Sequence, residues 1–221
     1  MVSRGLCFDL DGTLIDSGRK GLKRLLGLAV TRNLSLTPET EQRIRGMWGS
    51  DPIKLLQTIW PDENPQAFFI EWENLDNAEP HLAFPGTRES LEKLSPHFNM
   101  SIVTNRAFRT IMNQLLYNDI AQFFGLIITP EYNGHKKPEP EIMEPVLKRY
   151  KDNLIEPENV ILVGDTVAGD WKLAQAIGLE FYAVLCGGVD SRKKFLAAGV
   201  PENHIINSVV DLPKILLKIL S

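Results

Sequence analysis

Short apolar runs alternate with helical stretches along most of the chain, and this alternation constrains the fold more than any other feature. The apolar runs cover residues 6–8, 99–103, 126–128, 160–163 and 181–185, with a weaker run at 204–206. The helical stretches cover residues 87–94, 108–117, 140–150, 167–177, 191–198 and 208–220. Near-continuous apolar strands separated by helices are typical of a parallel sheet covered on both faces. Because crossovers in such sheets are right-handed, the sequence predicts a doubly wound, mostly parallel, Rossmann-like α/β sheet.

One segment, residues 18–81, interrupts this alternation with helix signals and no convincing strand. Apolar residues at helical spacing mark a first helix around residues 22–29. Three more helices begin where a capping residue is followed by proline in the first turn, at Thr37, Asp51 and Asn64. We therefore expect residues 18–81 to form an inserted helical subdomain, and residues 1–17 and 82–221 to form the sheet domain.

Composition excludes several classes of protein. The chain has 221 residues and a formal net charge of −4, so it has no electrostatic reason to bind nucleic acid. No apolar stretch approaches the roughly 18–20 residues that a membrane span needs, and we expect no membrane association. Cys7 and Cys186 are too few for a disulfide framework and lack metal-ligand spacing. We expect two buried thiols in a reducing compartment, with the cytoplasm as the default location.

Two carboxylates follow the first predicted strand, within residues 8–14 (FDLDGTL). Asp9 and Asp11 lie just past the strand end, so both can face one crevice at the carboxyl edge of the sheet, where open α/β sheets place their ligands. Gly12 permits a sharp turn away from the strand. An ordinary Asp-Gly turn is the alternative interpretation. It explains poorly why an apolar strand should deliver two acids and then Thr13.

A second pair of acids follows the fourth predicted strand, with Asp165 at its end and Asp170 in the start of the next helix. Asp170 alone is equally explained as an acid favoured by the helix N-terminal dipole. If the first and fourth strands are neighbours, however, these two acids converge with Asp9 and Asp11 and would repel one another unless a cation lay among them. Oxygen ligands with room for water suit Mg²⁺, so we expect a magnesium site formed by all four acids.

Two further elements point to a phosphate site. Thr104-Asn105 follows the second predicted strand, where a hydroxyl and backbone N–H groups can hold phosphate oxygens. Lys137-Pro138 precedes the helix after the third strand, and its ammonium can serve the same oxygens and a nucleophilic carboxylate. Each signal is weak alone, because Thr104 is also explained as a helix cap and Lys136-Lys137 as a solvated charged pair. Their positions after successive strands strengthen both.

With these motifs in this order, the chain resembles the haloacid dehalogenase superfamily of aspartate-dependent phosphotransferases. Residues 9–13 match its DxDGT signature, Thr104 its second motif, Lys137-Pro138 its third, and residues 164–170 the GDxxxxD form of its fourth. The helical insertion resembles the C1 cap of the phosphoglycolate phosphatase-like and β-phosphoglucomutase-like branch. Many members of that branch have GDxxxD spacing, whereas Asp165 and Asp170 are five residues apart. This departure affects the metal role of Asp170 more than that of Asp165.

The resemblance implies a role for each matching residue. Asp9 would attack the substrate phosphorus and form an aspartyl-phosphate. Asp11 would protonate the leaving alkoxide and then take a proton from the water that hydrolyses the intermediate. Mg²⁺ would be held by the Asp9 side chain, the Asp11 backbone carbonyl and Asp165, with Asp170 bound directly or through water. The remaining phosphate oxygens would be held by Thr104, the Asn105 backbone and Lys137.

The helical insertion is expected to close over the sheet edge and to help select the substrate. Its candidate contact loop is residues 45–49, where Arg45 and Trp48 could meet an anionic or ring-bearing group. The alternative places Trp48 in the core of the insertion and leaves Arg45 as a surface charge. Arg106 directly follows the second motif, so it either touches the phosphate or leaving group or forms a helix-surface salt bridge.

Four functions are open on the sequence alone. The first is a Mg²⁺-dependent phosphomonoester hydrolase that acts on a small phosphorylated metabolite. The second is a phosphomutase, in which the aspartyl-phosphate passes to a sugar. A signalling receiver domain shares the acceptor Asp, Thr and Lys, but it lacks the paired acids and the helical insertion. A catalytically silent binding protein is disfavoured because every motif is intact. The chain is expected to act as a monomer or homodimer.

Overall fold

The computed structural model describes residues 4–49 and 51–219 of the chain. The described chain divides into two compact units. One runs to Ser17 and resumes at Leu82, and it contains the sheet; the other is the helical segment Gly18–His81. Each unit has its own buried apolar core.

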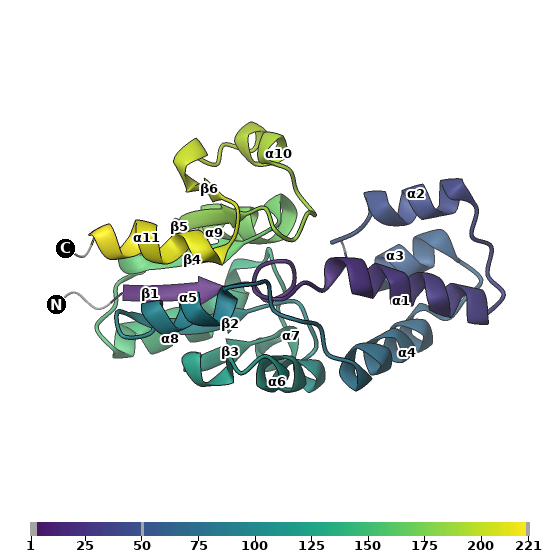
Figure 1. The fold of residues 1–221 in the computed structure, drawn as a ribbon, viewed down its shortest axis with the longest axis horizontal. Helices are drawn as coiled ribbons and strands as arrows, with labels where there is room; N and C mark the ends of the chain where they lie inside the picture. The colour runs from purple at the N-terminus through teal and green to yellow at the C-terminus, as the bar shows by residue number, and fades with distance from the viewer. Residues whose placement is uncertain (1–3, 50, 220–221) are drawn as a thin grey trace. The chain divides into compact units, whose positions relative to one another are not determined.

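Six parallel strands in the described part of the chain form one sheet, in the order β3-β2-β1-β4-β5-β6 (Figure 1). The strands are β1 (Arg4–Phe8), β2 (Phe98–Val103), β3 (Leu126–Ile128), β4 (Val160–Gly164), β5 (Glu180–Val184) and β6 (Ile205–Ile206). β1 pairs with β2 on one side and β4 on the other, so Cys7 lies opposite Ser101 and Leu162. The predicted doubly wound parallel α/β fold is confirmed, and the first and fourth strands are neighbours.

The two faces of the sheet are buried under different helices, because alternate strand residues point to opposite faces. Leu6 and Phe8 belong to one core cluster, whereas Cys7 between them belongs to the other. Helices α5 (Thr87–Leu94), α6 (Phe108–Tyr117) and α11 (Leu212–Leu216) contribute to the first cluster. Helices α8 (Glu144–Asp152), α9 (Lys172–Ile177) and α10 (Arg192–Ala197) contribute to the second. Both cysteines are free; Cys7 is buried as expected, but Cys186 is only half-buried because it lies in the loop after β5.

Three predicted helices are interrupted in the structure. The stretch 140–150 begins as a 3₁₀ turn, η2 (Pro140–Met143), and becomes α-helical only at Glu144, where Pro145 supplies the first turn of α8. The stretch 208–220 divides into η6 (Val209–Asp211), α11 and η7 (Leu217–Ile219), and residue 220 lies outside the described residues. A proline lacks the N–H that a continuous helix would use, so it marks a restart. The stretch 167–177 begins as the π-helix η4 (Val167–Trp171).

Several shorter elements were not expected from the sequence. They are η1 (Ala121–Phe123), α7 (Pro130–Asn133), η3 (Pro157–Asn159) and η5 (Glu202–His204). All four are single turns in connections between longer elements, where periodicity gives no signal.

Among its described residues the helical unit contains four helices, of which the last three begin where their caps predict. They are α1 (Gly18–Thr31), α2 (Pro38–Gly46), α3 (Pro52–Ile59) and α4 (Pro65–Ala78). The side chains of Thr37, Asp51 and Asn64 each accept a hydrogen bond from the backbone N–H three residues on, at 3.0–3.1 Å. These bonds satisfy N–H groups that a helix start leaves without partners. The buried core of the unit includes Leu25 and Phe68, and the Phe68 ring stacks on Trp60 at 5.5 Å.

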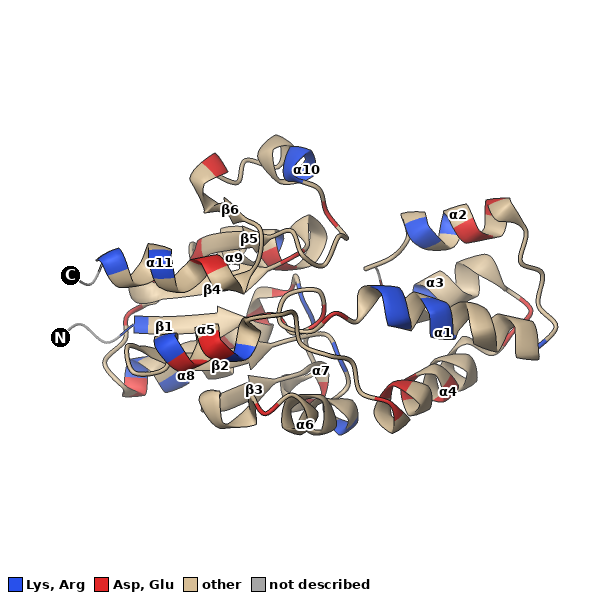
Figure 2. Cartoon of the chain, in the orientation of Figure 1, with Lys and Arg blue, Asp and Glu red and all other residues tan. Residues whose placement is uncertain are grey.

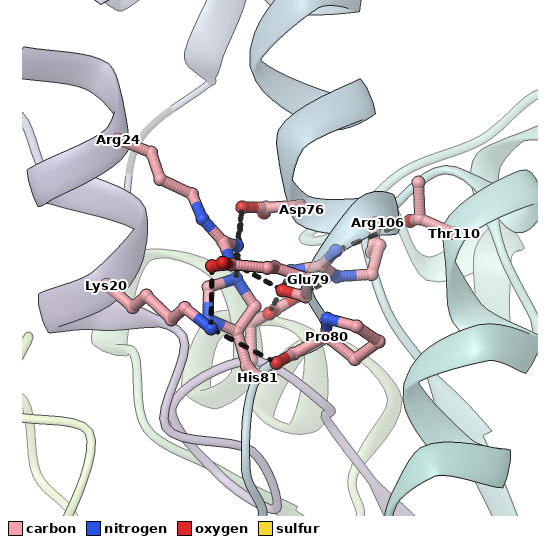
Figure 3. Close-up of polar contacts among 9 residues, drawn as sticks. Lys20, Arg24, Asp76, Glu79, Pro80, His81, Arg106 and Thr110 are labelled. Carbon is pink, nitrogen blue, oxygen red and sulfur yellow. Dashed lines mark hydrogen bonds and ion pairs between the residues drawn. The ribbon is translucent and has the colours of Figure 1, made fainter. Parts of the chain in front are cut away.

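Charged side chains also tie this unit together. The Arg24 cluster consists of Lys20, Arg24, Asp76, Glu79 and His81 (Figure 3). The Arg24 guanidinium, only 9% exposed, donates to Asp76 Oδ1 at 2.5 Å and to Glu79 Oε2 at 3.0 Å. His81 Nε2 lies 3.1 Å from the same Asp76 oxygen. The cluster therefore joins α1 to the end of α4 and to the residues that follow it.

Surface charges are mixed in sign on individual helices. In α2, Glu39 and Glu41 lie in the first turn and Arg43 and Arg45 in the last (Figure 2). This order suits the helix dipole, which favours acids at the N-terminus and bases at the C-terminus. None of the described helices is both long enough and apolar enough to cross a membrane.

Candidate active site

The first strand delivers Asp9 to the carboxyl edge of the sheet. Its backbone N–H donates to Val163 O at 2.8 Å, which extends the pairing of β1 with β4 by one residue. The Asp9 side chain is only 7% exposed. The chain then turns sharply at Gly12, whose φ is 79°, in the left-handed region. A Cβ at Gly12 would also overlap the Asp165 carboxylate, so glycine is required there for two reasons.

Lys137 reaches Asp9 from the loop between α7 and η2. Its buried Nζ lies 2.6 Å from Asp9 Oδ1 and 2.6 Å from Asp170 Oδ1. Its backbone is fixed by the side chain of Asn105, which accepts from Lys137 N at 2.8 Å and donates to Lys137 O at 3.1 Å. The sequence suggested only the Asn105 backbone for the site. The side-chain role was missed, although an amide that offers one donor and one acceptor is well suited to pair with a peptide unit.

The loop after β4 holds the other two acids. Asp170 Oδ2 accepts from Thr166 N at 3.0 Å and from Thr166 Oγ1 at 2.7 Å, while its Oδ1 faces Lys137. Asp170 lies in the π-helix η4, in which Trp171 N donates to Thr166 O, five residues back, at 3.1 Å. The widened turn accommodates the five-residue spacing from Asp165 to Asp170. It places the Asp170 carboxylate against Lys137 despite the departure from GDxxxD.

Four of these residues form the Asp9 cluster: Asp9, Lys137, Asp165 and Asp170. Ligand atoms of the three carboxylates lie within 4.8 Å of one another. Both Asp165 oxygens are buried and have no hydrogen-bond partner among the residues that the structure describes. A buried carboxylate without donors is costly unless something else neutralises it. The donor set is all carboxylate oxygen, which suits Mg²⁺, so the residues present fit a divalent cation.

Burial and mutual repulsion shift the protonation of this cluster. Burial raises the pKa of Asp9 to about 7 even though Lys137 lowers it, and the charges of Asp170 and Asp11 add to the rise. Burial, with the charges of Asp9 and Asp170, raises the pKa of Asp165 well above its usual value. Burial lowers the pKa of Lys137, but the charges of Asp170 and Asp9 outweigh that effect and raise it. One ammonium therefore faces three carboxylates, an imbalance that a cation would correct.

Asp11 is paired with Arg106 across the end of the sheet. Arg106 Nε and Nη2 donate to Asp11 Oδ2 and Oδ1 at 2.8 and 2.7 Å. Thr104 is buried, and its Oγ1 accepts from Arg106 N at 3.1 Å. Thr104 is thus no cap of α6, whose N-cap residue is Ala107. One alternative was that Arg106 forms a salt bridge on a helix surface. Its partner is instead Asp11, the proposed acid–base residue.

The two substrate residues predicted in the helical unit have other contacts. Trp48 is partly buried; it packs against Trp72, with ring centroids 5.6 Å apart, and against the apolar core of the unit. Arg45 is exposed in the last turn of α2, with Glu41 at 4.0 Å. The predicted contact of Arg45 and Trp48 with a substrate stays a prediction.

Asp190 is a site residue that sequence reasoning missed. It lies in the loop after β5, its side chain is 2% exposed, and it accepts from Val167 N at 2.6 Å. Lys194 also contacts its Oδ1. Asp190 therefore holds the first residue of the π-helix in place. Its only signal in the sequence is an acid in a loop that follows a strand end.

The family match covers most of the chain, from β1 to β5, including the helical unit. The haloacid dehalogenase-like hydrolase family matches residues 6–184, and the chain belongs to this family. A curated phosphoglycolate phosphatase of Aquifex aeolicus is 29% identical over 195 residues, which cover 84% of this chain and 86% of that protein. The N-acetylmuramic acid 6-phosphate phosphatase of Pseudomonas putida is 26% identical and covers 100% of this chain and 97% of its own length.

A solved structure gives the same fold. It is a protein of Thermotoga maritima assigned as a β-phosphoglucomutase, with a TM-score of 0.76 and 22% identity, and the match covers 98% of this chain and 99% of that one. The family match and the names of the curated relatives confirm the predicted enzyme class, a phosphatase of the haloacid dehalogenase type.

Proposed function

We propose that the protein is a Mg²⁺-dependent phosphomonoester hydrolase that acts on a small phosphorylated metabolite through an aspartyl-phosphate on Asp9. The observation that carries the proposal is the Asp9 cluster, in which a buried carboxylate is aligned by Lys137 beside an Asp165 whose oxygens have no hydrogen-bond partner among the described residues. This combination supplies a nucleophile and a cation site at one strand end.

Asp9 is the attacking group. Lys137 holds its Oδ1 at 2.6 Å, so we assign the attack on phosphorus to Oδ2. A magnesium ion held by the Asp9 and Asp165 side chains and the Asp11 carbonyl would offset the charge of the phosphate and allow an anionic nucleophile to approach. Thr104, the Asn105 backbone and Lys137 bind the other phosphate oxygens. Asp170 orients Lys137 through the 2.6 Å contact, whether or not it also meets the ion.

Asp11 moves the protons. Its side chain is 32% exposed, far more open than that of Asp9, as a group that meets both a leaving alcohol and a water must be. It donates a proton to the leaving oxygen as the P–O bond breaks and takes one from the water that attacks the aspartyl-phosphate. Together, the two proton transfers return Asp11 to its starting protonation state.

The helical unit is proposed as a cap that selects the substrate, and the protein as a cytoplasmic monomer or homodimer. The curated relatives named above are phosphatases of phosphoglycolate and of a sugar 6-phosphate, which supports small metabolites as the substrate class.

A panel of phosphorylated metabolites incubated with protein and Mg²⁺ tests the proposal, with released phosphate as the readout. We expect release from at least one ester, and none with Asp9→Asn. A hexose 1-phosphate belongs in the panel because an isomerised sugar with no phosphate released would favour a phosphomutase instead. Activity that survives exhaustive chelation would contradict the metal assignment.

A further inference from the structure

We propose that the exposed side of α6 is the interface of a homodimer, in which two copies of the chain pack this helix against itself in antiparallel orientation. The α6 face consists of Phe108, Met112, Leu116 and Tyr117, with Tyr132 of α7 beside it. The inference concerns the assembly of the protein and goes beyond the proposed hydrolase function, so each can be tested without the other.

The α6 face is apolar although the helix has already buried another side. Ile111 and Leu115 are fully buried and belong to the core on their face of the sheet. Phe108, Met112 and Leu116 recur every four residues, so they form one continuous stripe along the exposed side of the helix. Their exposed fractions run from 38% for Met112 to 66% for Leu116. The helix therefore has a second apolar side that its own sheet does not cover.

Two exposed tyrosines widen this stripe. Tyr117 follows Leu116, and Tyr132 adjoins the start of the helix, because the neighbouring Glu131 accepts a hydrogen bond from Phe108 N at 3.3 Å. A fully covered aromatic side chain buries about 150–250 Å², so the α6 face exposes roughly 500 Å² in each copy. Covering it in two copies removes about 1,000 Å² before any polar rim is counted, which is the area that a specific interface needs.

Other helices that cover the sheet present charged side chains to solvent (Figure 2). The outward residues of α5 are Arg88, Glu89, Glu92 and Lys93, and those of α8 are Glu144, Lys148, Arg149, Lys151 and Asp152. In α6, Arg109 is the sole charged residue. Aromatic residues, Met and Arg are enriched at protein interfaces, whereas Lys, Glu and Asp are depleted there. The composition of the α6 face is therefore typical of an interface.

The spacing of the stripe favours a second copy of the chain as the partner. Ridges formed by every fourth residue interdigitate when two helices pack in the commonest way. A two-fold axis through Met112 sets Phe108 of each copy beside Leu116 of the other, as an isologous contact requires. It also separates the two Arg109 residues by about 9 Å along the helices, since each residue rises 1.5 Å. Met112 suits the axis because its unbranched side chain adapts to its own copy.

Sedimentation equilibrium of the full chain tests the proposal. We expect the mass to rise to that of two chains over about 1–100 µM, the range for an interface of modest area. Met112→Glu should weaken the dimer at least about 100-fold, because two carboxylates then face each other across the axis. The matched control is Leu196→Glu, an exposed leucine in α10 on the other face of the sheet, which should keep the wild-type Kd.

Cross-linking tests the orientation of the two helices. Side chains at the two-fold axis come within the Cα separation of about 4.4–6.8 Å that a disulfide requires. Oxidation of Met112→Cys with copper–phenanthroline should therefore give a covalent dimer on a non-reducing gel, whereas Leu196→Cys should give none. Circular dichroism checks that the variants fold, and the wild-type mass and the cross-link decide the question if Met112→Glu does not.

Several results would overturn the inference. A wild-type protein that sediments as one chain over the whole range has no such dimer, and a dimer whose Kd is unchanged by Met112→Glu uses another surface. A wild-type dimer that Met112→Cys does not cross-link lacks the proposed two-fold axis. A mass that rises past two chains indicates an open head-to-tail assembly. None of these measurements involves phosphate release, so all of them leave the hydrolase proposal intact.

Discussion

The Arg24 cluster and the Asp9 cluster both contain buried charges, but they differ in balance. In the first, Lys20 and Arg24 meet Asp76 and Glu79, and the Arg24 guanidinium has carboxylate and carbonyl acceptors within 3.0 Å. In the second, one ammonium faces three carboxylates, and neither oxygen of Asp165 has a hydrogen-bond partner among the described residues.

The Arg24 cluster therefore stabilises the fold, whereas the Asp9 cluster favours binding of a cation. A cluster with matched charges and completed hydrogen bonds needs no ligand to neutralise it. Removing one member destabilises the fold, because a buried charge then loses an ion pair. An excess of one sign in a buried place raises the pKa of its members, as for Asp9 and Asp165, and favours binding of an opposite charge.

The largest effect is expected from Asp9→Asn. An amide is nearly isosteric with the carboxyl group but a poor nucleophile, so phosphate release should fall at least about 1,000-fold while the fold persists. Circular dichroism checks the fold. Asp152→Asn, at the exposed end of α8, is the control and should keep full activity. Residual turnover above a few per cent of wild type would reject Asp9 as the attacking group.

Arg24→Met should break the balanced cluster. Removing the guanidinium takes away the 2.5 Å ion pair of buried Asp76 and should lower the free energy of unfolding by about 3 kcal/mol, measured by urea denaturation. Arg45→Met is the control in the same unit, because Arg45 is exposed and its ion pair with Glu41 is 4.0 Å long. It should lower the free energy of unfolding by less than about 0.5 kcal/mol. Equal losses from the two variants would show that the Arg24 cluster is not a structural support.

Mg²⁺ should stabilise the protein through the unbalanced cluster. At a concentration about 100 times the Kd, the gain in the free energy of unfolding is about 2.7 kcal/mol, seen as a rise in Tm. Asp165→Asn should abolish this rise, whereas Arg24→Met should keep it from a lower starting Tm. A Mg²⁺-dependent rise that survives in Asp165→Asn would place the cation elsewhere.

The last prediction concerns the pH dependence of the metal-free protein. The pKa of Asp9 is about 7 in the folded protein against an ordinary value of 3.8, so between these values the native state binds more protons than the unfolded state. Its contribution to stability is therefore present below about pH 4 and is lost as the pH rises through 7. In EDTA, Asp9→Asn should show a shallower fall in Tm over this range. Parallel curves would mean that Asp9 titrates near its ordinary value.

The parts of the molecule that follow from local patterns were predictable. Alternation of strands and helices fixed the fold class, and Thr37, Asp51 and Asn64 marked three helix starts through bonds that span three residues. The acids Asp9 and Asp165 were found because each ends a strand, and parallel strands bring their carboxyl ends to one edge of the sheet.

What escaped prediction depends on partners far apart in the sequence. Arg106 and Asp11 are 95 residues apart, and Arg24 and Asp76 are 52 apart, so no periodicity links them. Asn105 and Asp190 act by holding the backbone of Lys137 and Val167, a role that leaves no pattern in the residue types. These contacts are set by tertiary packing, which local sequence does not encode.

The π-helix after β4 has a consequence for how the catalytic loop can vary in length. One additional residue in an ordinary helix would rotate everything downstream by about 100° and turn its apolar side outward. Here the wide turn of η4 absorbs the surplus residue, so Leu173 and Ala174 of α9 remain buried. The loop can thus lengthen by one residue without disturbing the scaffold beneath it.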